Sequence, residues 1–81
     1  MKDEIIQKIT LFLQTQVLDE PGRPIDPHEP LLSSGLIDSF SLVDVALFVE
    51  DSFHAKIKDT DLNPETFDNL EELAALIITR Q

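Results

Sequence analysis

The sequence predicts an all-α fold: a small helix bundle with three longer helices, one short third helix and a long first loop. Two observations predict it. Apolar residues recur at three- and four-residue steps in three separate segments, which is the spacing of one face of an α-helix. No alternating run of β-branched residues, the pattern typical of a strand, competes with them. We expect residues 1–81 to form a single domain, since a chain of this length holds one core.

The first helix is expected over residues 2–17. Its apolar stripe consists of Ile5, Ile9, Phe12, Leu13 and Val17. Lys8 and Gln14 fall away from that stripe, so the opposite face is expected to meet solvent.

A long loop is expected over residues 18–35. Four prolines and a glycine lie within residues 21–30, and each proline removes a backbone donor and restricts the residue before it. A loop of this length in a small domain is usually functional or disordered. Leu31 and Leu32 are expected to pin its end to the core, and residues 33–35 (Ser-Ser-Gly) predict a turn.

The second helix is expected to begin at Asp38 or Ser39, because an Asp or Ser just ahead of an apolar periodic run is a typical N-cap. It extends to Phe53. Its buried stripe is expected to consist of Leu42, Val45, Val49 and Phe53, with Ser52 as the alternative at the last position.

This helix carries a second apolar stripe, formed by Phe40, Val43 and Leu47. A helix at the surface of an isolated domain needs only one buried face. The second stripe is therefore either covered by the long loop or used to meet a partner. Four acidic residues and no basic one lie between Asp38 and Phe53.

Residues 54–64 are expected to form a loop, and Pro64 to open a short helical turn over residues 64–68. Asp68 or Asn69 is expected to cap the last helix. The buried face of that helix is predicted to hold Leu70, Leu73, Ala74, Ile77 and Ile78. Its acidic first turn and its basic residue in the last turn match the helix dipole.

The net charge of −10, from sixteen acidic and six basic residues, argues against binding to nucleic acid or to an anionic membrane. It favours partners with basic surfaces. Without cysteine there is no disulfide framework, thiolate nucleophile or cysteine-based zinc site. The charged N-terminus does not resemble a signal peptide or a membrane span, so a cytoplasmic location is expected.

The segment Asp59–Pro64 partly resembles a calcium-binding EF-hand loop. Asp59, Asp61 and Asn63 match the first three ligand positions. The sixth position should be Gly and is Pro64, and the twelfth should be Glu and is Leu70, so we expect no metal site.

No pattern of catalytic residues is evident. His28 and His54 lack a second ligand or partner at suitable spacing, and surface positions are expected for both. The acidic pairs at residues 50–51 and 71–72 point in different directions on a helix, so neither forms a catalytic dyad. The chain is therefore not expected to be an enzyme.

Ser39 is the most informative polar residue. If Asp38 caps the second helix, Ser39 is free at the positive end of that helix, where unpaired backbone donors and the helix dipole favour a phosphate. No His or Lys base is identifiable beside it, so a hydrolytic nucleophile is not expected.

The segment Gly35–Phe40 (Gly-Leu-Ile-Asp-Ser-Phe), followed by an acidic and apolar helix, resembles the modification site of acyl carrier proteins and peptidyl carrier domains. Length, acidity, the long first loop and the helix order extend this resemblance over nearly the whole chain. The resemblance implies the acyl-carrier-like four-helix bundle. In that family a separate phosphopantetheinyl transferase attaches a 4′-phosphopantetheine arm from coenzyme A to the serine hydroxyl. Ser39 stands at that position and Asp38 matches the motif aspartate.

The resemblance also implies a role and partners. The arm ends in a thiol that carries acyl or aminoacyl groups as thioesters between loading and synthase enzymes with basic docking surfaces. Family partners read the second helix. By position, Phe40, Val43 and Leu47 stand where the family shows apolar contacts, and Asp44 and Glu50 where it shows acidic ones. The carrier is expected to act as a monomer.

Two features distinguish the motif from that of the fatty-acid-synthesis type. Two residues, Leu36 and Ile37, separate Gly35 from the aspartate where that type usually has one, and Phe40 replaces the usual Leu. This form resembles small free-standing carriers of specialised pathways, including aminoacyl, nonribosomal-peptide and polyketide carriers. A housekeeping carrier of fatty acid biosynthesis, or an unmodified helical interaction module in which Ser39 only caps, are the alternatives.

Overall fold

Three α-helices carry the fold in the computed structural model, which describes residues 2–81 apart from the side chain of Ser39. They are α1 (Lys2–Phe12), α2 (Ser39–Phe53) and α3 (Leu70–Arg80), and the described range contains no strand. Two short elements join them: a π-helical turn η1 (Leu13–Val17) and a 3₁₀ turn η2 (Asp59–Asp61). The predicted all-α fold is confirmed.

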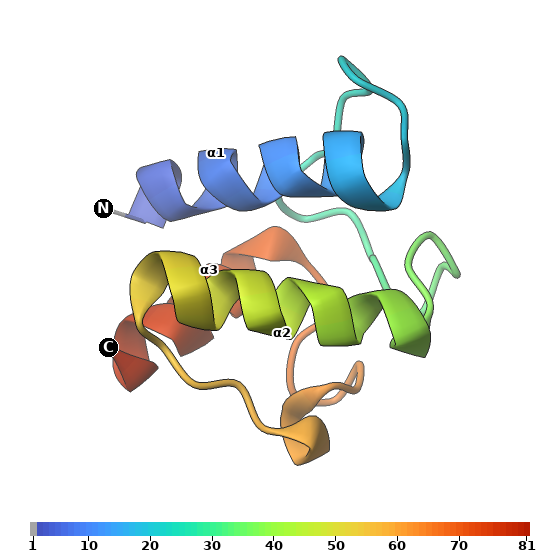
Figure 1. The fold of residues 1–81 in the computed structure, drawn as a ribbon. Helices are drawn as coiled ribbons and strands as arrows, with labels where there is room; N and C mark the ends of the chain where they lie inside the picture. The colour runs from blue at the N-terminus through green and yellow to red at the C-terminus, as the bar shows by residue number, and fades with distance from the viewer. Residues whose placement is uncertain (1) are drawn as a thin grey trace.

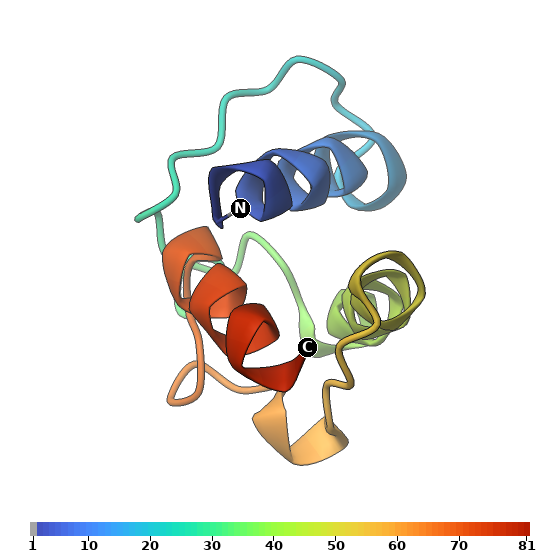
Figure 2. The same ribbon diagram turned by 90° about the vertical axis from the view of Figure 1, so that its left-hand side faces the viewer.

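The core lies where the three helices meet the end of the long loop. In Figure 1, α1 and α2 run in opposite directions, and α3 lies behind them. Figure 2 shows the three helices around a common centre. The largest fully buried side chains come from every segment: Ile9, Leu13, Leu31, Leu42, Val49, Phe67, Leu70, Leu73 and Ile77. Burial of these side chains is the main force that holds the bundle.

The first helical segment spans residues 2–17 as predicted, and its last turn widens. The amide of Leu18 donates to the carbonyl of Leu13 at 2.7 Å, a five-residue step typical of a π-helix. Of the predicted stripe, Ile5, Ile9 and Leu13 are buried, whereas Phe12 and Val17 are half-buried at its edge.

The periodicity missed one core residue of α1. Ile6 is buried and widens the apolar face of that helix.

Residues between η1 and α2 form the predicted long loop, and its end is anchored in the core. Leu31 is 1% exposed and Leu32 is half-buried, as expected. Ile37, just ahead of α2, is also buried, although the sequence pattern did not single it out. Two buried side chains therefore fix the chain at either end of the turn that leads to α2.

The helical turn predicted from Pro64 is present as a single turn over residues 64–66, where the carbonyl of Asn63 accepts from the amides of Thr66 at 3.1 Å and Phe67 at 3.2 Å. The side chain of Asn63 also accepts from the amide of Thr66 at 2.9 Å. The structure adds a second short element that the sequence did not predict, η2, which begins five residues earlier in the chain. Its Asp61 carboxylate accepts from the amide of Lys58 at 3.0 Å and stabilises that turn.

The last helix is capped by Asn69, whose side chain accepts from the amide of Glu72 at 2.8 Å. Four of its five predicted core residues are buried, but Ile78 is 42% exposed, so its assignment to the core was wrong. Near the end of α3, Arg80 pairs with Asp61 at 3.0 Å and ties the helix to η2. None of the helices in residues 2–81 has the length and apolar character needed to cross a bilayer.

Candidate functional site

The start of α2 is built by Asp38. Its backbone is extended, and its carboxylate accepts from the amide of Ser41 at 2.8 Å, which is N-cap geometry. This hydrogen bond holds the pKa of Asp38 below its ordinary value. Of the two predicted caps, Asp38 therefore fills the role, and Ser39 is the first residue of the helix.

The residues immediately before and after Ser39 are exposed to solvent. The flanking residues Asp38 and Phe40 are exposed, and Phe40 has 85% of its surface accessible. The side chain of Ser39 itself lies outside the described residues.

A hollow of about 280 Å³ lies beside this helix start. It is formed by the end of the long loop, the first turns of α2 and the segment after η2. Its walls are mostly apolar: Leu32, Gly35, Ile37, Asp38, Leu42, Leu62 and Pro64. An extended, partly apolar group attached at the start of α2 therefore has a shallow surface to lie along.

The two apolar stripes of α2 have different environments. Leu42, Val45 and Val49 are at most 2% exposed and form the core face, and Phe53 rather than Ser52 completes it.

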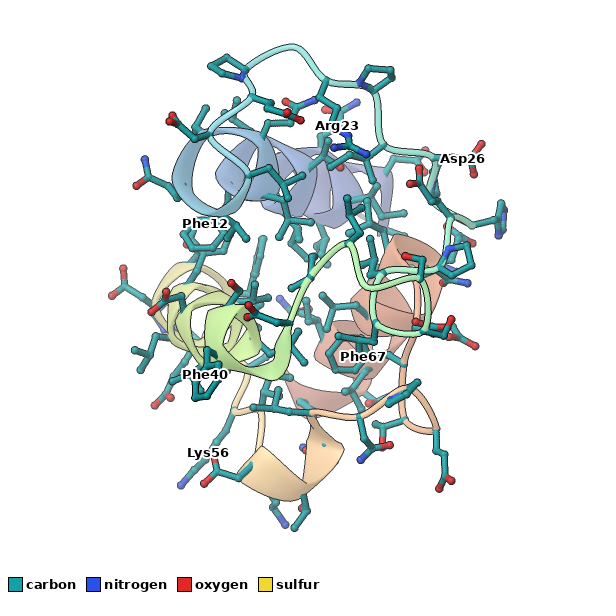
Figure 3. The ribbon with its side chains drawn as sticks, turned by 90° about the vertical axis from the view of Figure 1, so that its right-hand side faces the viewer. Phe12, Arg23, Asp26, Phe40, Lys56 and Phe67 are labelled. Atoms are coloured by element: carbon teal, nitrogen blue, oxygen red, sulfur yellow. The ribbon has the colours of Figure 1, made fainter. Side chains whose placement is uncertain are left out.

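The second stripe faces solvent: Phe40 is 85%, Val43 48% and Leu47 61% exposed. Phe40 projects away from the bundle in Figure 3, whereas Phe67 points into it. Of the two alternatives predicted for the second stripe, coverage by the long loop is therefore excluded.

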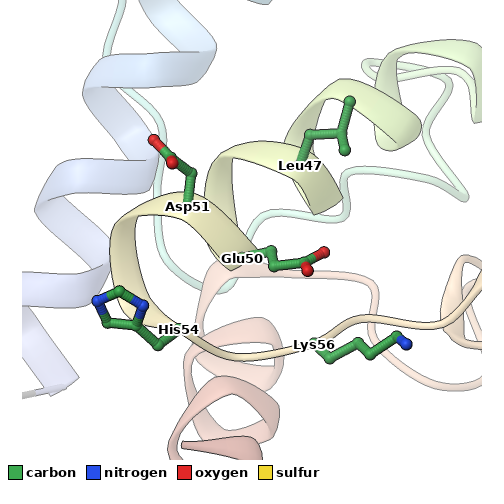
Figure 4. A pocket seen from close by; sticks show the side chains of 5 residues that line it. All are labelled: Leu47, Glu50, Asp51, His54 and Lys56. Carbon is green, nitrogen blue, oxygen red and sulfur yellow. The ribbon is translucent and has the colours of Figure 1, made fainter.

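Asp44 and Glu50 are also exposed on α2. At the carboxyl end of the helix, a hollow of about 570 Å³ is lined by Leu47, Glu50, Asp51, His54 and Lys56. Figure 4 shows Leu47 and Glu50 on the same stretch of helix, with the Lys56 side chain on the following segment. The exposed face of α2 thus joins an apolar strip to carboxylates, and Lys56 lies beyond its end.

Sequence reasoning missed part of this surface. Lys56 lines the hollow together with Leu47 and Asp51, although the sequence pattern did not single it out. The spacing of Leu47 and Asp51, one helical turn apart, is the signal that places them together. Nothing in the periodicity of the helix indicates Lys56, because it lies beyond the helix end.

The other candidates from the sequence have structural roles. Asp61 holds Arg80 and the amide of Lys58, and Asn63 holds its own turn. His28 and His54 are exposed, and His54 ends α2 with a left-handed backbone, φ 57°. Within residues 2–81 no group of three acidic, His or Cys side chains is arranged to hold a metal ion.

Comparison with known proteins places this arrangement in a family. The chain matches the family model described as a phosphopantetheine attachment site over residues 13–77, which is more than half of its length. No curated protein matches the chain. Members of the matched family carry a covalently attached 4′-phosphopantetheine group and are generally carriers without catalysis of their own.

The residues of this chain fit such a group. The match spans the whole of α2, including its open start and the adjoining apolar hollow, and the helix dipole favours the phosphate of the arm at that end. The all-helical fold agrees with the match over residues 13–77, and the chain belongs to the phosphopantetheine-binding family of acyl and peptidyl carrier proteins.

Proposed function

We propose that this protein is an acyl or aminoacyl carrier whose 4′-phosphopantetheine arm is attached at Ser39. The main support for this proposal is the position of Ser39: it is the first residue of α2, it directly follows the Asp38 cap, and it lies inside the family match. When bound, the arm supplies a thiol, which this chain lacks, for thioester formation. Residues 1–81 then serve as one carrier domain, monomeric and cytoplasmic, and the chemistry belongs to partner enzymes.

The roles of the chain's own residues follow from the geometry. Asp38 fixes where the helix begins and so makes Ser39 the first residue of α2. During attachment the Ser39 oxygen forms a bond to the β-phosphorus of coenzyme A. The nucleotide part leaves with the bridging oxygen, and the hydroxyl proton passes to a base of the transferase. The chain needs no base of its own for this step.

The exposed face of α2 is the proposed contact for the transferase and for the loading and synthase enzymes. Phe40, Val43 and Leu47 supply apolar contact area, and their exposure supports this assignment. Asp44 and Glu50 supply charge toward basic partners. Tethering the intermediate to such a carrier raises its effective concentration at each partner's active site.

A specialised pathway, rather than housekeeping fatty acid synthesis, is the proposed setting. The support is the motif itself, with Leu36 and Ile37 between Gly35 and Asp38 and with Phe40 after the serine.

Intact-mass spectrometry tests the proposed attachment. After incubation with coenzyme A, Mg²⁺ and a broad-specificity phosphopantetheinyl transferase, we expect the chain to gain the mass of one phosphopantetheinyl group. Ser39→Ala should gain no mass. Ser41→Ala, which changes the serine two residues further along α2, should still be labelled. Labelling of Ser39→Ala would refute the site. An unchanged mass of the wild type with a transferase that labels another carrier would refute the function and favour the unmodified interaction module.

A further inference from the structure

Asp68, at the start of α3, binds the loop that leads to α2. Its Oδ1 accepts from the backbone amides of Leu32 at 2.8 Å and of Ser33 at 3.0 Å, and its Oδ2 accepts from the hydroxyl of Ser33. These residues are more than thirty positions apart in sequence. One carboxylate therefore joins the last helix to the loop immediately before the attachment site.

Backbone hydrogen bonds hold Asp68 itself in place. The amide of Asp68 donates to the Glu72 side chain at 2.7 Å, and the carbonyl of Asp68 accepts from the amide of Leu31 at 2.6 Å. One turn on, the amide of Glu71 donates to the carbonyl of Pro27 at 3.1 Å. Figure 2 shows the loop passing beside the start of α3. The carboxylate thus sits on a rigid support.

The segment from Leu31 to Ile37 is closed on itself. The amide of Ile37 donates to the carbonyl of Leu31 at 3.0 Å, and that of Gly35 to the carbonyl of Leu32 at 3.1 Å. Leu31 and Ile37 are buried, whereas residues 33–35 are exposed. Between its two buried ends, this turn is held to the rest of the bundle through Leu32 and Ser33, the residues that Asp68 binds.

We propose that Asp68 is a positioning residue for phosphopantetheine attachment: by holding Leu32 and Ser33, it keeps the turn before α2 in the conformation that presents Ser39 to the transferase. This inference rests on the proposed function. When the clamp is removed, the turn samples other conformations at its exposed residues, and the fraction of carrier that the transferase can bind productively falls. The Michaelis constant for the carrier rises by the reciprocal of that fraction, while the turnover of bound carrier is unchanged.

Steady-state kinetics of the transferase test this, with the carrier as the varied substrate. Asp68→Ala removes all three hydrogen bonds at the carboxylate. We expect KM for the carrier to rise at least about threefold, with kcat unchanged, which corresponds to a competent fraction of about one third or less. Glu65→Ala is the matched control, because it removes the same charge from an exposed position on the same connection.

Asp68→Asn should restore KM to near the wild-type value. Its Oδ1 can still accept from both amides, and its amide nitrogen can donate to the Ser33 hydroxyl, which then accepts instead of donating. Rescue by this variant separates the hydrogen bonds from the charge of Asp68.

Amide hydrogen exchange on the same variants separates local positioning from general destabilisation. In Asp68→Ala, the amides of Leu32, Ser33, Gly35 and Ile37 should exchange faster, while those of Ile5 and Ile9 in α1 keep their wild-type rates. The inference is overturned if KM stays within the control's range, or if exchange accelerates equally in α1. It is also overturned if kcat falls instead of KM rising. If the wild type accepts no phosphopantetheine, the proposed function itself is refuted. If the wild type is labelled but Asp68→Ala behaves like the control, only the role of Asp68 is refuted.

Discussion

Among the carboxylates of this protein, Asp38, Asp61 and Asp68 accept hydrogen bonds from backbone amides that no helix ladder satisfies. Asp38 caps α2, Asp61 stabilises η2, and Asp68 holds the long loop. Each bond satisfies an orphan donor at a turn or helix end, where an unpaired group would be costly. In an acidic chain, these three side chains therefore have individual structural roles beyond their contribution to net charge.

These contacts predict loss of stability in acid. Hydrogen bonds from Ser41 lower the pKa of Asp38, and the Arg80 side chain lowers that of Asp61. The Ser33 hydroxyl does the same for Asp68. The ordinary value is 3.8, so their stabilising contribution is complete above about pH 3.8 and is lost as pH falls through the lower folded-state values.

Urea unfolding from neutral pH to about pH 2 measures this effect. The difference in unfolding free energy between the wild type and Asp61→Asn should be greatest at neutral pH and should shrink below about pH 3.8. Asp59→Asn, at an exposed position in the same short turn, serves as the control. A wild-type advantage over Asp61→Asn that persists undiminished in acid would contradict the expected role of that carboxylate.

At the scale of elements, the two apolar faces of α2 have different roles. One face packs into the core, and the other presents Phe40, Val43 and Leu47 to solvent. At its edge, Phe48 stacks on Phe12 of α1 with ring centroids 4.3 Å apart, which joins the two helices without using the exposed stripe. The helix is therefore held from one side and leaves the other available.

Substitution of two valines, two positions apart on α2, separates these jobs. Val45→Asp places a carboxylate in the core, where Val45 is 2% exposed, and should destabilise the fold by about 3 kcal/mol or more. Val43→Asp, at a position 48% exposed, should change the unfolding free energy by at most about 1 kcal/mol and leave far-UV circular dichroism intact.

Turnover by a partner enzyme should fall with Val43→Asp despite the intact fold. Chemical denaturation and partner kinetics on the same samples give both readings. Loss of helicity in Val43→Asp would show that the exposed stripe is needed for folding. Unchanged partner kinetics would remove Val43 from the proposed docking face.

At the scale of the whole molecule, the excess of acidic over basic residues sets long-range behaviour. Three of the six basic side chains form ion pairs in the described residues: Lys2 with Glu71, Arg23 with Glu20 and Arg80 with Asp61. No Lys or Arg lies within α2. The proposed docking helix is therefore purely acidic in its own charged residues, and such a charge pattern accelerates encounter with basic surfaces.

Ionic strength tests this electrostatic steering. Raising salt from about 0.05 M to about 0.5 M shortens the Debye length from roughly 14 Å to roughly 4 Å, so KM of the carrier for the transferase should rise several-fold. Far-UV circular dichroism at both salt concentrations checks that the fold is unchanged. A KM that is constant or falls with salt would contradict charge-driven docking.

Local sequence patterns predicted the structure correctly where a residue type has a single structural role. The stripe of Leu42, Val45 and Val49 and the long proline-rich loop are present as predicted, and the N-cap of α2 is Asp38, one of the two predicted candidates. Asp68 and Asn69 were not distinguishable from sequence, because Asp and Asn cap helices about equally well. Asn69 caps α3, and Asp68 is left to bind the loop.

Errors arose where tertiary packing overrides a local pattern. Ile78 has the spacing of a core residue but lies at the edge of the buried face of α3: it is 42% exposed, whereas its neighbour Ile77 is fully buried. Pro64 opens a single turn as predicted, whereas η2, the short element before it, was not predicted. The contact of Arg80 with Asp61 stabilises η2, and a pairing nineteen residues apart leaves no periodic signal.

By itself, the sequence determined the helical fold class and placed the start of α2 at Asp38 or Ser39, and the structure then shows Asp38 as the cap. These depend on side-chain chemistry and spacing within one or two turns. Tertiary structure alone decided that the stripe of Phe40, Val43 and Leu47 meets solvent and that Asp68 holds the turn before the serine. Both depend on which distant segments come together, and burial of the core around Leu31 and Phe67 sets that arrangement.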